Sequence, residues 1–235
     1  MGILNRIGLV FARKWIGGTT IGEAVAESRR LNAKGEKVII NYLGEELKDM
    51  AKININARTY LSLLQKMKSC GVKGSIAVKP TQLGLNLGYK IFLQNYAKIV
   101  KKAKTLGIFV WMDMEDYQFV DDSIRAYMTV VKSGSAGICI QAKLKRSMSD
   151  LRRLVPNGAI IRLVKGAYST REGITFTSKH EIDNDYLKCM DYLFQNCRSF
   201  MIATHDDKMS GRAMDMQRKY KKRIMFGMLS EPRTR

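Results

Sequence analysis

The chain of 235 residues carries 41 Lys+Arg against 21 Asp+Glu, a formal net charge of +20, with 46% hydrophobic and 26% charged residues. This composition is that of a globular protein, and only three prolines with no low-complexity tract exclude a disordered or collagen-like chain. The longest apolar runs, such as 107–111 and 159–164, are strand-sized and fall far short of the roughly 20 residues of a membrane span.

The N-terminal segment does not resemble a secretory signal, because basic residues interrupt and follow the apolar patch of residues 1–12 and no small-residue cleavage site follows. We interpret it as a short helix rather than an organelle transit peptide. No linker divides the chain, so we expect a helical arm over residues 1–35 and a single domain over residues 36–235. The four cysteines form no C-x-x-C pair, which favours reduced thiols in a cytoplasmic protein, with Cys139 in the core.

The positive charge favours anionic partners in general, whether nucleic acid, anionic lipid or acidic metabolites. Its densest cluster is the segment 218–223. Because no aromatic-interleaved basic motif or zinc-finger spacing accompanies it, we interpret the charge as a solvated lysine-rich surface and expect no specific nucleic-acid binding.

From near residue 36 onward, short apolar runs rich in β-formers alternate with segments of helical spacing. The predicted strands are Lys37–Leu43, Gly74–Lys79, Ile108–Met114, Gly137–Ala142, Ile160–Lys165, Phe200–His205 and Arg223–Leu229. A helix is expected after each strand, for example over Asn56–Ser69, Leu87–Leu106, Asp122–Ser133, Glu181–Arg198 and Ser210–Lys222. This alternation predicts repeated βα units and a parallel sheet, in the α/β class.

Two architectures fit such units: a TIM-type (βα)8 barrel, here with about seven units, and a doubly wound open sheet. The ends of the predicted strands favour the barrel, because polar side chains follow one strand after another and in a barrel those ends converge on one mouth. The residues concerned are Lys79, Asp113, Gln141, Arg162, Lys165 and His205.

The sequence lacks the motifs of several common binding and catalytic sites. The sequence has no G-x-G-x-x-G after the first strand, no Walker A loop and no G-x-S-x-G elbow. Its two histidines, His180 and His205, have no close Cys, His or Asp cluster, so we expect no metal site.

The strand-end residues suggest a site that can hold an anionic group. Arg162 lies within the apolar stretch 159–164, where a guanidinium must be paired or hold an anionic group. Asp113 follows an equally apolar run, and Gly166 after Lys165 allows close approach of the backbone to a ligand. For each residue a structural role remains open: an Asp113–Arg162 ion pair, an ordinary turn at Gly166, and side chains of Gln141 and His205 satisfied by the protein itself.

These residues also lie in motifs that resemble those of the proline dehydrogenase family, and in the family's order. The matching runs are YLGE (42–45), VKPTQLG (78–84), WMDMED (111–116), GICIQAKLKR (137–146), IIRLVKGAY (160–168) and ATHD (203–206). The resemblance implies a (βα)8-type barrel that binds FAD at its mouth and oxidises L-proline to 1-pyrroline-5-carboxylate, the first step of proline breakdown to glutamate. It further implies a quinone as electron acceptor and peripheral association with the inner face of the membrane.

The resemblance also assigns roles by motif position. Asp113 and Arg162 would be catalytic, with Arg162 near the reacting edge of the flavin, and Lys79 would bind the substrate. The flavin contacts would be Met114, Gln141, Arg162, Lys165, Gly166, Ala167, Thr204 and His205. A fixed cation beside the flavin would stabilise the negative charge that hydride transfer places on the ring.

Two departures from the family pattern are visible. Family members continue into an eighth strand and a helix whose Tyr-x-x-Arg-Arg motif clamps the proline carboxylate, and the sequence contains no such motif after residue 229. Lys143 stands where the family usually has a tyrosine. We therefore expect this chain, as given, to bind FAD weakly and oxidise proline poorly. The alternatives are a flavin-binding remnant or partial subunit without turnover, and a basic protein that binds anionic surfaces.

Overall fold

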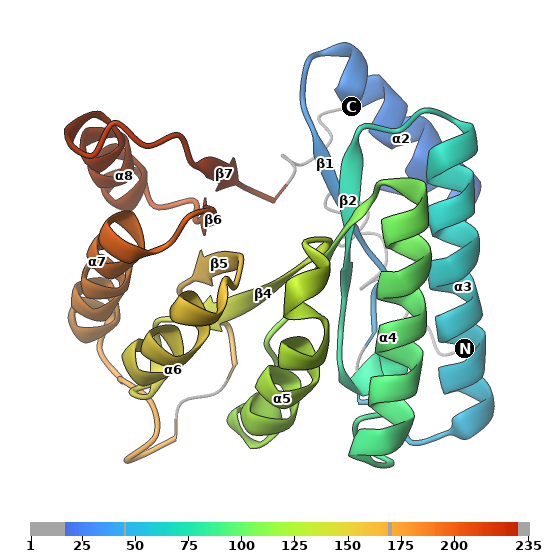
Figure 1. Cartoon of the computed structure of the whole chain (residues 1–235), viewed down its shortest axis with the longest axis horizontal. Coiled ribbons are helices and arrows are strands. Elements are labelled where there is room, and N and C mark those ends of the chain that lie inside the picture. The colour runs from blue at the N-terminus through green and yellow to red at the C-terminus, as the bar shows by residue number, and fades with distance from the viewer. Residues whose placement is uncertain (1–16, 45, 169–170, 230–235) are drawn as a thin grey trace, which may run out of the picture.

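The computed structural model describes residues 17–44, 46–168 and 171–229. Within them, a seven-stranded parallel sheet follows the order of the chain, each strand pairing with the next, and curls so that helices cover its convex side (Figure 1). The strands are β1 (Val38–Asn41), β2 (Gly74–Val78), β3 (Phe109–Met112), β4 (Ala136–Gln141), β5 (Ile161–Val164), β6 (Phe200–Ala203) and β7 (Met225–Gly227). This sequential order confirms the barrel-type prediction and excludes the doubly wound sheet, whose strand order would reverse.

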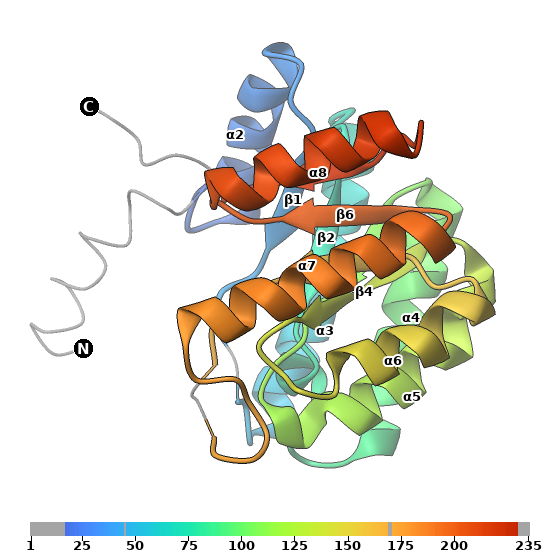
Figure 2. The ribbon, with the colours of Figure 1, turned by 90° about the vertical axis from the view of Figure 1, so that its left-hand side faces the viewer.

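One α-helix follows each of the first six strands, and a further helix precedes β1. The helices are α2 (Ile21–Ala33), α3 (Met50–Ser69), α4 (Tyr89–Leu106), α5 (Val120–Val130), α6 (Ser147–Leu154), α7 (Lys179–Asn196) and α8 (Asp207–Lys219). Figure 2 shows α7 and α8 side by side across the outer face of the sheet. Helix α2 lies within the predicted arm and packs against β1 and α3, with Val25 in the main core; residues 1–12, predicted as a short helix, lie outside the described residues.

Both faces of the sheet are covered by apolar side chains, as a parallel sheet requires. The outward residues of the strands join the helices in one large core, whereas the inner face carries a second cluster built on Ala77, Trp111 and Met201. Gly137 makes room for this cluster, since a Cβ there would lie 2.5 Å from Cζ3 of Trp111. The rings of Trp111 and Phe109, with centroids 4.9 Å apart, thus fill the inner face toward its base and leave the carboxyl ends of the strands to polar groups.

The strands are shorter than predicted at their carboxyl ends. Lys79, Asp113 and Lys165 each follow directly after the last residue of a strand. A helix was expected after the fourth strand without stated bounds, and the structure has it as α6 over residues 147–154. Its eight residues include two arginines and one aspartate, and only short apolar spacing marks its buried face.

Candidate active site

The polar groups of the mouth sit on successive strands. Lys79 follows β2 and Asp113 follows β3, and the register pairs Val78 with Met112, so the two residues are neighbours across the sheet. The backbone N–H of Asp113 donates to the carbonyl of Val78 at 2.9 Å, which extends the ladder by one bond. The predicted substrate-binding and catalytic residues therefore share the same edge.

Asp113 and Arg162 form an ion pair across the concave face. The guanidinium Nη2 of Arg162 donates to Oδ1 of Asp113, and the side chains are only 12% and 14% exposed. Asn41, at the end of β1, donates from Nδ2 to the other oxygen of Asp113 at 2.8 Å. Burial opposes the charge of Arg162, but Cys139 and Asp113 outweigh it and raise the pKa of the guanidinium. Asp113 thereby fixes a permanent cation from β5 at the mouth.

Gln141 and Gly166 meet at the ends of β4 and β5. The side-chain Nε2 of Gln141 donates to the carbonyls of Met114 and Glu115, at 3.3 and 2.8 Å. Gly166 has φ +107°, and a Cβ there would lie 2.9 Å from Oε1 of Gln141. Glycine is therefore needed here for two reasons: the backbone has a positive φ, and the side chain of Gln141 approaches closely. The turn at Gly166 is thus not an ordinary one. Ala167, which follows, is exposed.

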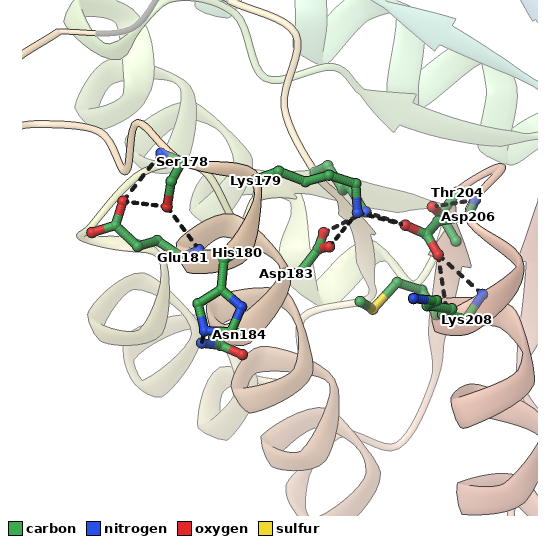
Figure 3. Close-up of polar contacts among 11 residues, drawn as sticks. Ser178, Lys179, His180, Glu181, Asp183, Asn184, Thr204, Asp206 and Lys208 are labelled. Carbon is green, nitrogen blue, oxygen red and sulfur yellow. Dashed lines mark hydrogen bonds and ion pairs between the residues drawn. The ribbon is translucent and has the colours of Figure 1, made fainter.

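Lys165 is held by two carboxylates. Its Nζ lies 2.5 Å from Oδ1 of Asp183 and 2.6 Å from Oδ2 of Asp206. Lys179 reaches the same pair from the start of α7, with Nζ 2.5 Å from Oδ2 of Asp183 and 3.5 Å from Oδ2 of Asp206 (Figure 3). The hydrogen bond from Lys165 lowers the pKa of Asp206 to about 2. Two cations and two anions thus balance at this corner of the mouth.

Thr204 and His205 also find partners within the chain. The backbone N–H of Asp206 donates to Oγ1 of Thr204 at 3.1 Å, which forms the turn into α8. The N–H of Leu229 donates to Nε2 of His205 at 3.0 Å, tying the segment after β7 to β6. These bonds correspond to the structural role that the sequence left open for His205.

The residues present fit a flavin in part. The largely buried guanidinium of Arg162 lies within β5. The amide of Gln141 and the glycine that a Cβ would crowd lie at the ends of β4 and β5, so polar groups are available for a planar ring with polar edges. Lys165, predicted to contact the flavin, already bonds two carboxylates, so an anion would have to compete with Asp183 and Asp206 for its ammonium.

Fold and site define a (βα)-barrel enzyme whose charged groups converge on the carboxyl ends of its strands. Residues 24–230 match the proline dehydrogenase family. The chain belongs to the proline dehydrogenase family.

Its relatives agree with this assignment. It is 27% identical over 243 residues to proline dehydrogenase 2 of Bacillus subtilis (strain 168), covering 98% of this chain and 80% of that protein. It is 28% identical over 203 residues to the proline dehydrogenase of Deinococcus radiodurans, covering 84% of this chain and 66% of that protein.

Among solved structures, the chain resembles proline utilization A from Bdellovibrio bacteriovorus inactivated by N-propargylglycine. The TM-score is 0.87 at 20% sequence identity. The match covers 96% of this chain and 29% of that one, so the chain spans less than a third of that protein's length. At this identity the likeness confirms the (βα)-barrel fold.

Several groups at the site were missed by sequence reasoning. Asn41 lies inside the predicted strand 37–43 and was not selected by the strand-end rule, because the observed strand β1 already ends at this residue. Cys139 was assigned to the core, where it is 3% exposed, yet its sulfur also contacts Arg162. Asp183 lies inside α7 and comes to Lys165 only through the packing of that helix, which no local signal predicts.

Proposed function

We propose that the chain is an FAD-dependent proline dehydrogenase that oxidises L-proline to 1-pyrroline-5-carboxylate and passes the electrons to a quinone. The observation that carries the proposal is the Asp113–Arg162 pair, held at the mouth of a barrel whose residues 24–230 match the family. Its relatives in Bacillus and Deinococcus are named as proline dehydrogenases.

The reaction breaks a C–H bond next to the ring nitrogen as hydride and releases the N–H proton. FAD, when bound, would accept the hydride. Arg162 keeps a positive charge at the mouth at every physiological pH, and charge held in place before the reaction stabilises negative charge as it develops. Lys79 offers a cation to the proline carboxylate, and Asp113 holds Arg162 in place while its second oxygen bonds Asn41.

The proposal is tested with purified protein by the flavin absorbance spectrum and by proline-dependent reduction of a dye. Flavin binding with proline turnover that falls at least about tenfold in Arg162→Met supports it. Bound flavin without turnover indicates the alternative, a catalytically impaired flavin-binding form. Absence of both flavin binding and turnover contradicts the proposal.

The approach of a quinone implies contact with a membrane surface. No helix among the described residues is long and apolar enough to cross a bilayer. Helices α3 and α4 pack together and carry four and five Lys or Arg residues without any Asp or Glu (Figure 1). Eight of these nine are lysines, whose point charges suit a diffuse anionic surface, and no exposed aromatic ring for base stacking lies on either helix. We propose that this acid-free face contacts anionic lipid.

Vesicle binding tests this face. Sedimentation with phosphatidylcholine vesicles should require added phosphatidylglycerol and should weaken as salt rises. The exposed set Lys98→Glu, Lys101→Glu and Lys104→Glu on α4 should abolish it. The matched set Lys208→Glu, Arg212→Glu and Lys219→Glu on α8, with the same change in net charge, should reduce it much less. Equal losses in both sets would contradict a defined face.

A further inference from the structure

Cys139 lies directly across the sheet from Arg162. The register of β4 and β5 pairs the two residues, and Nε of Arg162 is 2.6 Å from Sγ of Cys139. The thiol is 3% exposed. None of the roles assigned at the mouth includes this cysteine, although it touches the proposed catalytic arginine more closely than any other neutral side chain described there.

The thiol closes a triangle of contacts with the ion pair. Arg162 donates through Nη2 to Oδ1 of Asp113 and through Nε to the sulfur, while the sulfur lies 3.9 Å from that same Oδ1. Two separate N–H groups of the planar guanidinium are therefore engaged in different directions. The centre of the Trp111 ring lies 5.4 Å from the guanidinium carbon, so the indole limits the movement of the guanidinium on a further side. Such a planar fork with two fixed bonds has little rotational freedom left.

The protonation state of the thiol suits this arrangement. Burial raises the pKa of Cys139 to about 11, although Arg162 opposes the rise. The sulfur is therefore a neutral S–H at physiological pH: it accepts from Nε and aims its weak donor at Asp113. A hydrocarbon side chain of the same size could not accept, and the Nε–H of a side chain that is 12% exposed would lose its partner.

We propose that Cys139 is a positioning residue for Arg162: its sulfur accepts the Nε–H and so sets the direction in which the remaining guanidinium N–H groups face the mouth. The effect of Cys139 on turnover rests on the proposed function, whereas its effect on the orientation of Arg162 does not.

The direct test observes the arginine Nε–H by NMR in protein with 15N-labelled arginine, with the Arg162 signal assigned from Arg162→Lys. In the original chain this proton should exchange slowly with water. Cys139→Val should shift the signal and speed its exchange by about tenfold or more, and Cys139→Ser, which restores an acceptor, should return exchange to within a few-fold. Cys189→Val is the matched control, since Cys189 is equally buried but lies on α7.

Turnover gives the second measurement. With flavin bound, Cys139→Val should lower kcat for proline by about tenfold with little change in KM, and Cys139→Ser should recover most of it. An unchanged Nε–H signal in Cys139→Val, or a loss that Cys189→Val reproduces, would overturn the inference. If no variant binds flavin or oxidises proline, the proposed function fails, and the NMR comparison alone still decides the role of Cys139.

Discussion

Asp113 shows how one carboxylate can organise the mouth. It joins Asn41 from β1 to Arg162 from β5. Removing it in Asp113→Ala leaves a guanidinium that is 12% exposed without its counter-charge, so we expect a loss of about 2–4 kcal/mol in the free energy of unfolding. Urea denaturation measures this. Asp122→Ala is the control, because its pair with Arg125 at 2.9 Å is exposed and should be worth at most about 1 kcal/mol; equal losses would show that the Asp113 pair is not structural.

Gly166 carries a second prediction. Gly166→Ala adds a Cβ 2.9 Å from Oε1 of Gln141 to a backbone at φ +107°, and we expect a loss of about 2 kcal/mol together with weaker flavin binding. Gly173→Ala is matched in its positive φ, +76°, but its Cβ would meet no atom of the described residues within 4 Å, so it should cost only the backbone strain, about 1 kcal/mol. Urea denaturation and flavin titration separate the two contributions. Similar effects in both variants would mean that close packing at Gly166 plays no part.

At the level of side chains, the sequence predicts which polar residue follows a strand, and this is why Lys79 and Asp113 were found. Arg162 was found because a charged residue inside an apolar stretch must be paired. The sequence cannot predict which of these residues pair, because pairing depends on the curl of the sheet. Cys139 illustrates the limit. From sequence alone, a cysteine in a buried strand is interpreted as a core residue. Only the pairing of β4 with β5 shows that the sulfur of Cys139 lies against Arg162.

The first turns of α7 and α8 are stabilised by their own caps. Ser178 and Glu181 form a capping box at α7, and the carboxylate of Asp206 accepts from the N–H groups of Lys208 and Met209 at α8 (Figure 3). Because Asp206 also accepts from Lys165, it links a helix start to the end of β5. One carboxylate therefore sets the position of α8 relative to the mouth.

This link predicts a pH dependence. Asn is as good an N-cap as Asp, so Asp206→Asn removes the ion pair with Lys165 and retains the cap. The pKa of Asp206 is lowered from 3.8 to about 2, so the ionised form stabilises the fold above about pH 4 and that contribution is lost as pH falls toward 2. In urea denaturation, the stability difference between the original chain and Asp206→Asn should shrink over this range. A difference that stays constant from pH 6 to pH 2 would contradict the charge contribution.

Among the elements, long periodic segments were predicted well and short ones poorly. The apolar spacing of α4 and α7 gave their C-terminal ends to within about two residues. Helix α3 begins earlier than predicted, at Met50 with Asp49 as its cap, because its first turns expose Ile55 and bury Asn56, which disrupts the apolar period. Helix α6 has only eight residues, too few for spacing alone to distinguish it from a loop.

The whole molecule is an open curl rather than a closed cylinder within the described residues, since β1 and β7 each pair with one neighbour. An edge strand lacks half of its possible ladder bonds and opens at lower cost than a central one. Strand β4 is buried along its full length, whereas Met225 and Phe226 of β7 are 39% and 40% exposed. Local stability should therefore fall from the centre of the sheet toward β7.

Amide hydrogen exchange tests this gradient at the scale of the molecule. For amides of β3, β4 and β5, the free energy of the opening that permits exchange should approach that of global unfolding. Amides of β7 should exchange at least about 100-fold faster, because opening β7 exposes little apolar surface. Strand β6, which lies between them and has two neighbours, should be intermediate. Exchange at β7 as slow as at β4 would mean that its free edge is covered in solution. Slow exchange at β7 that disappears on dilution would identify the cover as a second copy of the chain.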